Sequence, residues 1–146
     1  FSIINADGSM NPSELNNMLN CIIDNGNDVV FGSRYMKNAG SEDDDLTTKI
    51  GNFIFSFIGR FFFRLKISDI LYTYVVGKTK LVKDLDLKFG DFKLCIELPI
   101  KAHRKKYKYS SYPCYERKRI AGKKKVSPFI DGFKILTGMI YLFFKQ

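Results

Sequence analysis

A short polar motif near the start of the chain has residue types that could bind a metal ion. Asn5-Ala6-Asp7-Gly8-Ser9 follows Phe1-Ser2-Ile3-Ile4, an apolar run that is typical of the end of a β-strand. In α/β proteins, ligands bind just beyond the carboxyl ends of such strands. The Asp7 carboxylate could hold a hard divalent cation there, and such a cation keeps some waters and bridges to substrate phosphates. An Asp-Gly turn before a helix is also a common structural turn, so the motif alone leaves both interpretations open.

A run of cations in the last quarter of the chain could bind an anion. It comprises Arg117, Lys118, Arg119, Lys123, Lys124 and Lys125. These cations surround Gly122, whose missing side chain lets a phosphate approach the backbone. Residues 1–73 carry a net charge of −3 and residues 74–146 one of +12. We therefore expect a phosphate, a nucleic acid or an acidic membrane surface as partner, and the structural alternative is a solvated basic loop.

Composition and length restrict the class of protein. The chain has 146 residues, of which 45% are hydrophobic, so it is predicted to be one globular domain and not a disordered segment. Three widely spaced cysteines indicate neither a disulfide framework nor a paired zinc site, and they favour a reducing compartment. Arg60 and Arg64 interrupt the most apolar stretch, which excludes a membrane span there. Because Phe1 stands where a Met would begin a protein, we expect a fragment that begins inside a domain.

The elements that position these motifs are predicted from hydrophobic periodicity and turn residues. Strands are expected at residues 3–4, 28–31, 70–76 and 107–115, the last as an edge strand. Helices are expected at residues 13–25, 46–64, 92–106 and 127–145, and a short helix or turn at residues 80–88. This order predicts an α/β fold with a parallel sheet. Four strands are few for such a sheet, which again predicts missing N-terminal strands. The acidic run at residues 42–45 is expected to be a solvated, mobile loop.

Two of the predicted helices have apolar faces that could contact lipid. The residues concerned are Phe53, Phe57 and Phe61 in the first helix and Ile135, Met139, Tyr141 and Leu142 in the second. Both helices also carry cations suited to anionic headgroups. We expect both to lie on the membrane side of the domain, and the alternative is ordinary packing against the sheet.

Five segments occur along the chain in an order that resembles a known enzyme family. They are Asn5-Ala6-Asp7-Gly8-Ser9 before Pro12, Asp28-Val29-Val30-Phe31-Gly32-Ser33-Arg34-Tyr35, Asp69, Cys95-Ile96-Glu97-Leu98-Pro99 and the basic run. Together they resemble the family 2 glycosyltransferases, and the most similar branch is the dolichol-phosphate (polyprenyl-phosphate) sugar synthases. The resemblance covers essentially all of residues 1–146, as the C-terminal portion of one catalytic domain. It implies that the strands holding the nucleotide base and ribose precede Phe1.

The resemblance implies a partial GT-A fold, Rossmann-like, that binds a nucleotide-sugar with a divalent metal, Mg²⁺ or Mn²⁺. Asp7 falls on the last Asp of the family's Asp-x-Asp motif and is the expected metal ligand and catalytic residue. Asn5 replaces the first Asp, and Ser9 is expected to complete this polar edge. Arg34 resembles an arginine that lies near the donor or acceptor phosphates, and a salt bridge that fixes the loop is the alternative.

The basic run resembles the family's Arg-x-x-Gly-x-Ser-Lys loop, whose cations face the acceptor phosphate. Arg119 and Lys125 match its two cations, Lys124 stands in place of its Ser, and Arg117 adds a further positive charge. The expected function is transfer of a sugar to a polyprenyl or dolichyl phosphate at the cytoplasmic face of a membrane. Such an acceptor is already ionised and needs positioning more than a general base.

Alternative functions remain open at this point. A saccharide hydroxyl as acceptor would require a carboxylate base, and Asp91 is the local candidate. A non-enzymatic module that binds nucleic acid or membrane would explain the basic and aromatic residues 104–109, but no nucleic-acid motif is present and no nucleic-acid partner is expected. Glu97 is interpreted as a structural salt bridge, and His103 as a surface residue.

Overall fold

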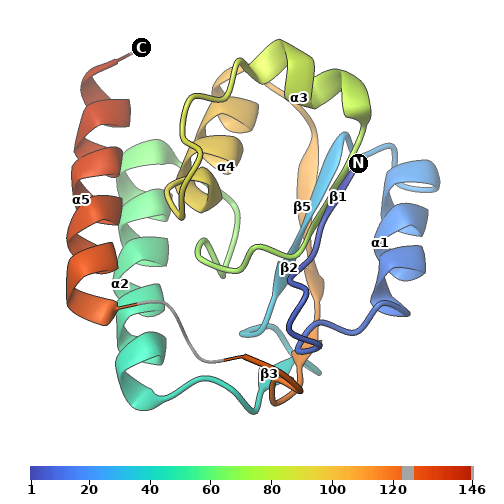
Figure 1. Ribbon diagram of the computed structural model, residues 1–146. Coiled ribbons are helices and arrows are strands. Elements are labelled where there is room, and N and C mark those ends of the chain that lie inside the picture. Colours follow the sequence, from blue (N-terminus) through green and yellow to red (C-terminus); the bar gives the residue numbers. More distant parts are fainter. Residues whose placement is uncertain (123–126, 146) are drawn as a thin grey trace.

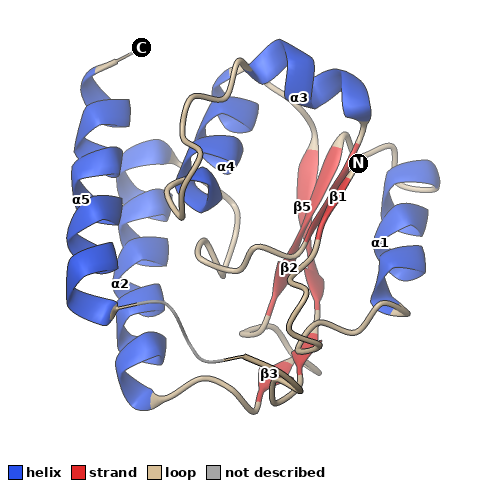
Figure 2. Cartoon of the chain, in the orientation of Figure 1, coloured by secondary structure: helices blue, strands red, loops and turns tan. Residues whose placement is uncertain are grey.

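The part of the chain that the structure describes, residues 1–122 and 127–145, forms five helices and six short strands. A computed structural model shows their arrangement (Figures 1 and 2). The strands are β1 (Ser2–Ile3), β2 (Val29–Ser33), β3 (Gly40–Ser41), β4 (Val75–Gly77), β5 (Tyr109–Pro113) and β6 (Tyr115–Glu116). The helices are α1 (Glu14–Ile23), α2 (Leu46–Phe63), α3 (Thr79–Leu85), α4 (Leu94–Arg104) and α5 (Pro128–Phe144). The predicted α/β class and the four predicted helices are confirmed, and the segment expected as a short helix or turn forms α3.

A four-stranded sheet in the order β1-β4-β2-β5 lies at the centre of the fold. β4 is antiparallel to both of its neighbours, β1 and β2, whereas β2 and β5 are parallel. The sheet is therefore mixed, and the prediction of a parallel sheet is wrong for β4. β5 is an edge strand, as predicted. β3 and β6 form a separate parallel pair beside the carboxyl end of β2.

The segment that precedes β4 explains both its direction and its shortness. After α2 the chain runs back along that helix before it enters the sheet, so β4 returns antiparallel to β2 (Figure 1). The amide of Ile70 donates to Ser56 Oγ at 3.1 Å, and the amide of Leu71 donates to Asn52 Oδ1 at 3.2 Å. Because side chains of α2 satisfy these amides, the predicted strand at residues 70–76 forms ladder bonds only at its end.

Two apolar cores lie on opposite faces of the sheet. Val29 and Phe31 of β2 belong to the core shared with α2, α4 and α5, whereas Val30 belongs to the core under α1. This alternation follows from the two-residue period of a β-strand. Figure 1 shows α1 alone on one face of the sheet, with α2, α4 and α5 on the opposite face. No described helix has both the length and the apolar composition needed to cross a membrane.

Replacing Asn52 by Ala tests the support that α2 gives to the segment before β4. The substitution leaves the part-buried Leu71 amide without its partner, and an unpaired donor away from water costs about 1–3 kcal/mol. We expect Asn52→Ala to lower the free energy of unfolding by that amount in urea titrations. Asn17→Ala, the same change at an exposed position of α1, is the control and should have little effect.

Candidate functional site

The loop that leaves β1 has a conformation fixed by its own side chains. Asp7 Oδ1 accepts hydrogen bonds from the amide of Ser9 at 3.0 Å and from its hydroxyl at 2.8 Å. Gly8 has φ +80°, in the left-handed region that favours glycine, and a Cβ there would lie 2.8 Å from Ile120 Cδ1. Asn5 Oδ1 accepts from the Thr73 hydroxyl at 3.2 Å. Asp7 and Ser9 are thus bonded to each other and Asn5 to Thr73, and contacts of these residues with a ligand stay a prediction.

The basic segment lies directly against this loop, although more than 100 residues separate them in sequence. The Ser9 carbonyl accepts from the Arg117 amide at 2.8 Å, and the Asp7 carbonyl accepts from the Ile120 amide at 2.9 Å. The contact between Gly8 and Ile120 adds side-chain packing to these backbone bonds. The structure thus brings the predicted metal ligand and the predicted phosphate-binding loop together.

Arg119 links three parts of the site. Its guanidinium makes a two-pronged hydrogen bond with Asp43, from Nε to Oδ1 at 3.1 Å and from Nη2 to Oδ2. Its Nη1 lies 3.9 Å from Asp7 Oδ2. Mainly through the hydrogen bond to Asp43, the pKa of Arg119 lies above its ordinary value. The side chain keeps 23% of its surface exposed, so a ligand can still reach it.

Arg34 is enclosed by carboxylates. Its Nε and Nη2 donate to the two oxygens of Asp69 at 2.8 and 3.0 Å, and its Nη1 donates to Asp44 and Glu116 at 2.9 and 3.1 Å. Burial alone would lower the pKa of Arg34, but these carboxylates, Asp69 foremost, hold it above its ordinary value. Tyr72 stacks under the guanidinium, with its ring centroid 4.5 Å from Cζ.

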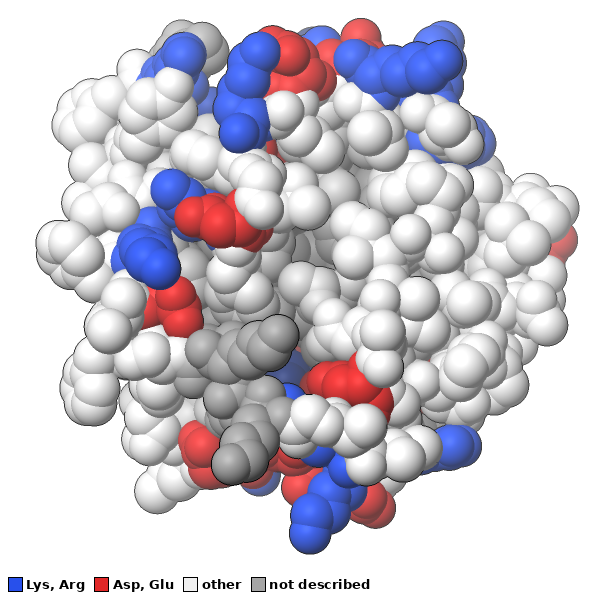
Figure 3. Space-filling model, viewed as in Figure 1, with Lys and Arg blue, Asp and Glu red and all other residues white. Residues whose placement is uncertain are grey.

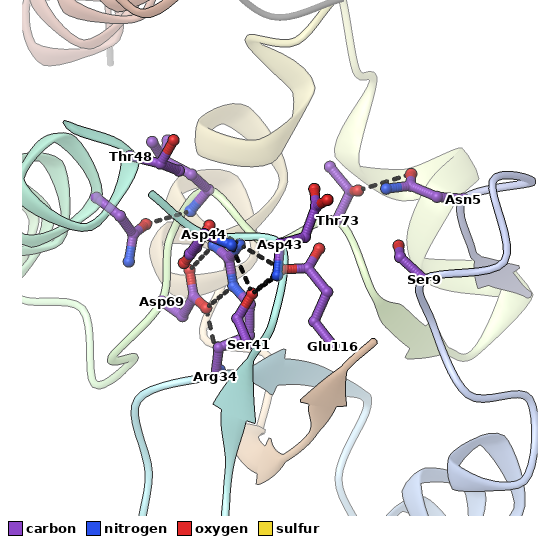
Figure 4. A network of polar contacts seen from close by, with 12 residues as sticks. Asn5, Ser9, Arg34, Ser41, Asp43, Asp44, Thr48, Asp69, Thr73 and Glu116 are labelled. Carbon is purple, nitrogen blue, oxygen red and sulfur yellow. Dashed lines mark hydrogen bonds and ion pairs between the residues drawn. The ribbon is translucent and has the colours of Figure 1, made fainter. Parts of the chain in front are cut away.

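The contacts of Arg34 are those of a salt bridge that fixes loops, which was one of the two interpretations of this residue. Only 8% of Arg34 is exposed. Its partners come from the segment before α2, the segment before β4 and β6 (Figure 4). A direct contact of Arg34 with phosphate stays a prediction.

The acidic run is not the solvated, mobile loop that its composition predicts. Glu42 accepts from the Tyr115 hydroxyl and the Lys118 amide, and Asp43 pairs with Arg119. Asp44 pairs with Arg34 and has 3% of its side chain exposed, while Asp45 caps α2 by accepting from the Thr48 amide at 2.7 Å. Each of the four consecutive acidic residues thus has a partner of its own. For Glu42 and Asp43, complementarity to the basic run was the signal in the sequence that could have predicted this.

The remaining predicted residues have the following places. Arg117 and Lys118 are exposed, and Lys124 and Lys125 lie outside the described residues.

The Glu97 carboxylate accepts hydrogen bonds from the amides of residues 88 and 89 and lies 2.7 Å from Lys101 Nζ, which confirms its structural role. His103 is half-buried, with Nδ1 3.0 Å from the Tyr109 hydroxyl, so its interpretation as a surface residue holds only in part. Asp91 accepts from the Lys93 amide just before α4.

Asp7 is the carboxylate expected to bind a divalent metal. The described residues contain no group of three or more His, Cys, Asp or Glu side chains that could hold an ion. Mg²⁺, however, is commonly bound through one or two carboxylates, with water and substrate phosphates as the other ligands. Asp7 Oδ2 does not take part in the turn that Oδ1 makes with Ser9, and it lies 3.9 Å from Arg119 Nη1. Binding of a divalent ion by Asp7 stays a prediction.

The chain was also compared with known proteins. No protein-family model matches it, and none of the curated proteins does. The resemblance to family 2 glycosyltransferases therefore rests on the motifs of the sequence alone.

Replacing Asp69 by Asn tests the Arg34 cluster. The change removes the charge that both prongs of the Arg34 guanidinium engage, and breaking a buried ion pair costs about 3–5 kcal/mol. We expect Asp69→Asn to lower the free energy of unfolding by that amount in denaturant titrations. Asp24→Asn, at an exposed position just after α1, should change it by less than about 0.5 kcal/mol.

Proposed function

We propose that residues 1–146 are the later part of the catalytic domain of a glycosyltransferase with a GT-A fold. Its reaction would move a sugar from a nucleotide-sugar to a polyprenyl or dolichyl phosphate. The main support for this proposal is the contact between the Asp7 loop and the basic segment, where Arg119 Nη1 lies 3.9 Å from Asp7 Oδ2. A donor site and an acceptor site have to adjoin for transfer, and here the residues expected for each are neighbours. The mixed α/β fold is compatible with this proposal.

A lipid phosphate suits a site built in this way. Its second pKa lies near 6, so it is largely ionised at neutral pH and needs no general base to become a nucleophile. The chain has to position the phosphate and neutralise its charge. Arg119 is the described cation best placed to do so, since a guanidinium binds two oxygens of a phosphate at once.

Asp7 would hold Mg²⁺ or Mn²⁺, with the amide oxygen of Asn5 and the hydroxyl of Ser9 along the same polar edge. When bound, such an ion supplies Lewis-acid stabilisation of the departing nucleoside diphosphate. Asp7 itself is oriented by its hydrogen bonds with Ser9, and Arg34 fixes the surrounding loops. These contacts set the geometry of the site before any ligand arrives.

An exposed apolar surface on α2 and α5 supports a membrane-bound acceptor. The two helices lie side by side, and the ring of Phe62 meets that of Phe143 at 6.0 Å between centroids (Figure 1). Their exposed residues include Phe53, Phe57, Phe61, Phe129, Phe133, Ile140 and Phe144. Figure 3 shows this flank as a mostly uncharged surface with scattered charges of both signs. We propose that it rests on the cytoplasmic face of a membrane, with nearby cations facing anionic headgroups.

The structure changes which residues of α5 form this surface. Ile135, Met139 and Leu142, expected on the lipid side, are each 2% exposed and belong to the core. Tyr141 is exposed, as expected. The helix is apolar on nearly all sides, so its periodicity did not tell the buried face from the exposed one.

Replacing Asp7 and Arg119 tests the catalytic proposal. In the intact protein, Asp7→Ala should lower sugar transfer about a hundredfold or more. Arg119→Ala should raise the KM for polyprenyl phosphate about tenfold or more, because a charge-assisted hydrogen bond contributes about 1.5–3 kcal/mol. The KM for the nucleotide-sugar should change far less. Lys80→Ala, which removes an exposed cation on α3, is the control, and equal effects of Arg119→Ala on both substrates would contradict the assignment.

Replacing exposed phenylalanines tests the membrane surface. Phe57→Glu with Phe133→Glu should lower binding to phosphatidylcholine–phosphatidylserine vesicles at least about tenfold, because burying each ring contributes about 1.5–3 kcal/mol. The matched control is Leu19→Glu with Ile23→Glu, two exposed apolar residues of α1 on the other side of the sheet. Sedimentation with vesicles gives the measurement. Equal losses in both double variants would contradict a role for this particular surface.

A further inference from the structure

Asp43 holds the guanidinium that the proposed function assigns to the acceptor phosphate. Its two carboxylate oxygens bind Arg119 Nε and Nη2, the same paired arrangement in which an arginine binds two oxygens of a phosphate. The Asp43 side chain is 17% exposed, so the pair lies at the surface of the site and not deep in the core. An arriving phosphate therefore meets a carboxylate already bound to Arg119.

The backbone around Asp43 is held independently of this ion pair. Ser41 Oγ accepts from the amides of Asp43 and Asp44 at 3.2 and 3.0 Å and donates to Glu116 at 2.6 Å. On either side, Asp44 is anchored by Arg34 and Asp45 caps α2. The loop thus has its own anchors, and the Asp43 carboxylate can leave Arg119 without unfolding it. Figure 4 shows Asp43 between the Arg34 cluster and the loop that carries Asn5 and Ser9.

The charge of an anion determines how well it competes with Asp43 for the Arg119 guanidinium. A carboxylate carries a single negative charge, whereas a phosphate monoester at neutral pH carries about 1.5 to 2. The dianionic phosphate is the stronger partner for a guanidinium, but a monoanion gains little by replacing Asp43. An internal carboxylate at this place therefore weakens the binding of every anion to Arg119 and favours dianionic ligands over monoanionic ones.

We propose that Asp43 is an internal anion that occupies Arg119 until the acceptor phosphate displaces it, and that it sets the specificity of the site for a phosphate monoester. The proposal rests on the proposed function. Its consequence is that removing the Asp43 charge strengthens acceptor binding, whereas a residue with a merely structural role would weaken binding when replaced. The loop also leads directly into α2, so exchange at Arg119 takes place next to the helix proposed to lie on the membrane.

The test compares Asp43→Asn with Glu42→Gln in the intact protein. Both variants remove one negative charge from the same loop, but Glu42 contacts Tyr115 and the Lys118 amide and not the Arg119 guanidinium. The first measurement is the KM for dolichyl phosphate in neutral phosphatidylcholine vesicles. We expect Asp43→Asn to lower it about two- to fivefold, the range of a partly exposed ion pair, and Glu42→Gln to leave it unchanged.

The second measurement needs no sugar transfer. Binding of methyl phosphate and of dimethyl phosphate is followed by the NMR signal of Arg119 Nε–H. Asp43→Asn should bind both probes more tightly and should show a smaller preference for the monoester. If wild type neither transfers sugar nor binds dolichyl phosphate, the proposed function is wrong, and this second measurement still decides the role of Asp43.

Three results would overturn the proposal. The first is an unchanged or weaker binding of methyl phosphate by Asp43→Asn. The second is an equal gain in affinity for methyl phosphate in Glu42→Gln, which would show that the effect comes from net charge alone. The third is loss of folding, by circular dichroism, in both Asp43→Asn and Asp43→Ser, which would make Asp43 a structural residue.

Discussion

The ion pairs of the buried Arg34 guanidinium are the interaction on which the loops around the candidate site depend. A charge can be buried only when it is paired and hydrogen-bonded, and Arg34 meets this condition with Asp69, Asp44 and Glu116. These partners come from three separate stretches of the chain. One side chain at the end of β2 therefore fixes the segment before α2, the segment before β4 and the β6 strand relative to one another.

The loops fixed in this way also carry the residues proposed to bind ligands. Asp43 is adjacent to Asp44, and Arg119 follows Glu116 by three residues. The Arg34 cluster thus determines where the Asp43–Arg119 pair lies, and Arg119 in turn approaches Asp7. The geometry of a proposed ligand site rests on an ion-pair cluster that need not touch the ligand.

α2 connects this polar edge to the apolar flank of the molecule. Its inner face is lined by Asn52, Ser56 and Gly59, which hold the chain before β4, whereas Phe53, Phe57 and Phe61 face outward. Its first turn is capped by Asp45, the last residue of the acidic run. The surface proposed to contact lipid and the site proposed to bind a lipid phosphate are therefore built on one continuous segment.

The sequence alone determined the helices and the central strand β2. Periodicity placed α2, which begins at residue 46 as predicted, and the apolar run before Gly32 placed β2. The motif at Asp7 was expected in a loop after a strand, and it lies there. Such features depend on the preferences of neighbouring residues, which a sequence displays directly.

Only the tertiary structure decided which distant residues meet. The antiparallel direction of β4 depends on the path of the chain along α2, and no residue within the strand specifies it. The partners of Arg34 and Arg119 lie 10 to 112 residues away from them, and a charge in a sequence does not say which opposite charge it will meet. The buried face of α5 was likewise undetermined, because a helix that is apolar on nearly all sides acquires an inside and an outside only when it packs against its neighbours.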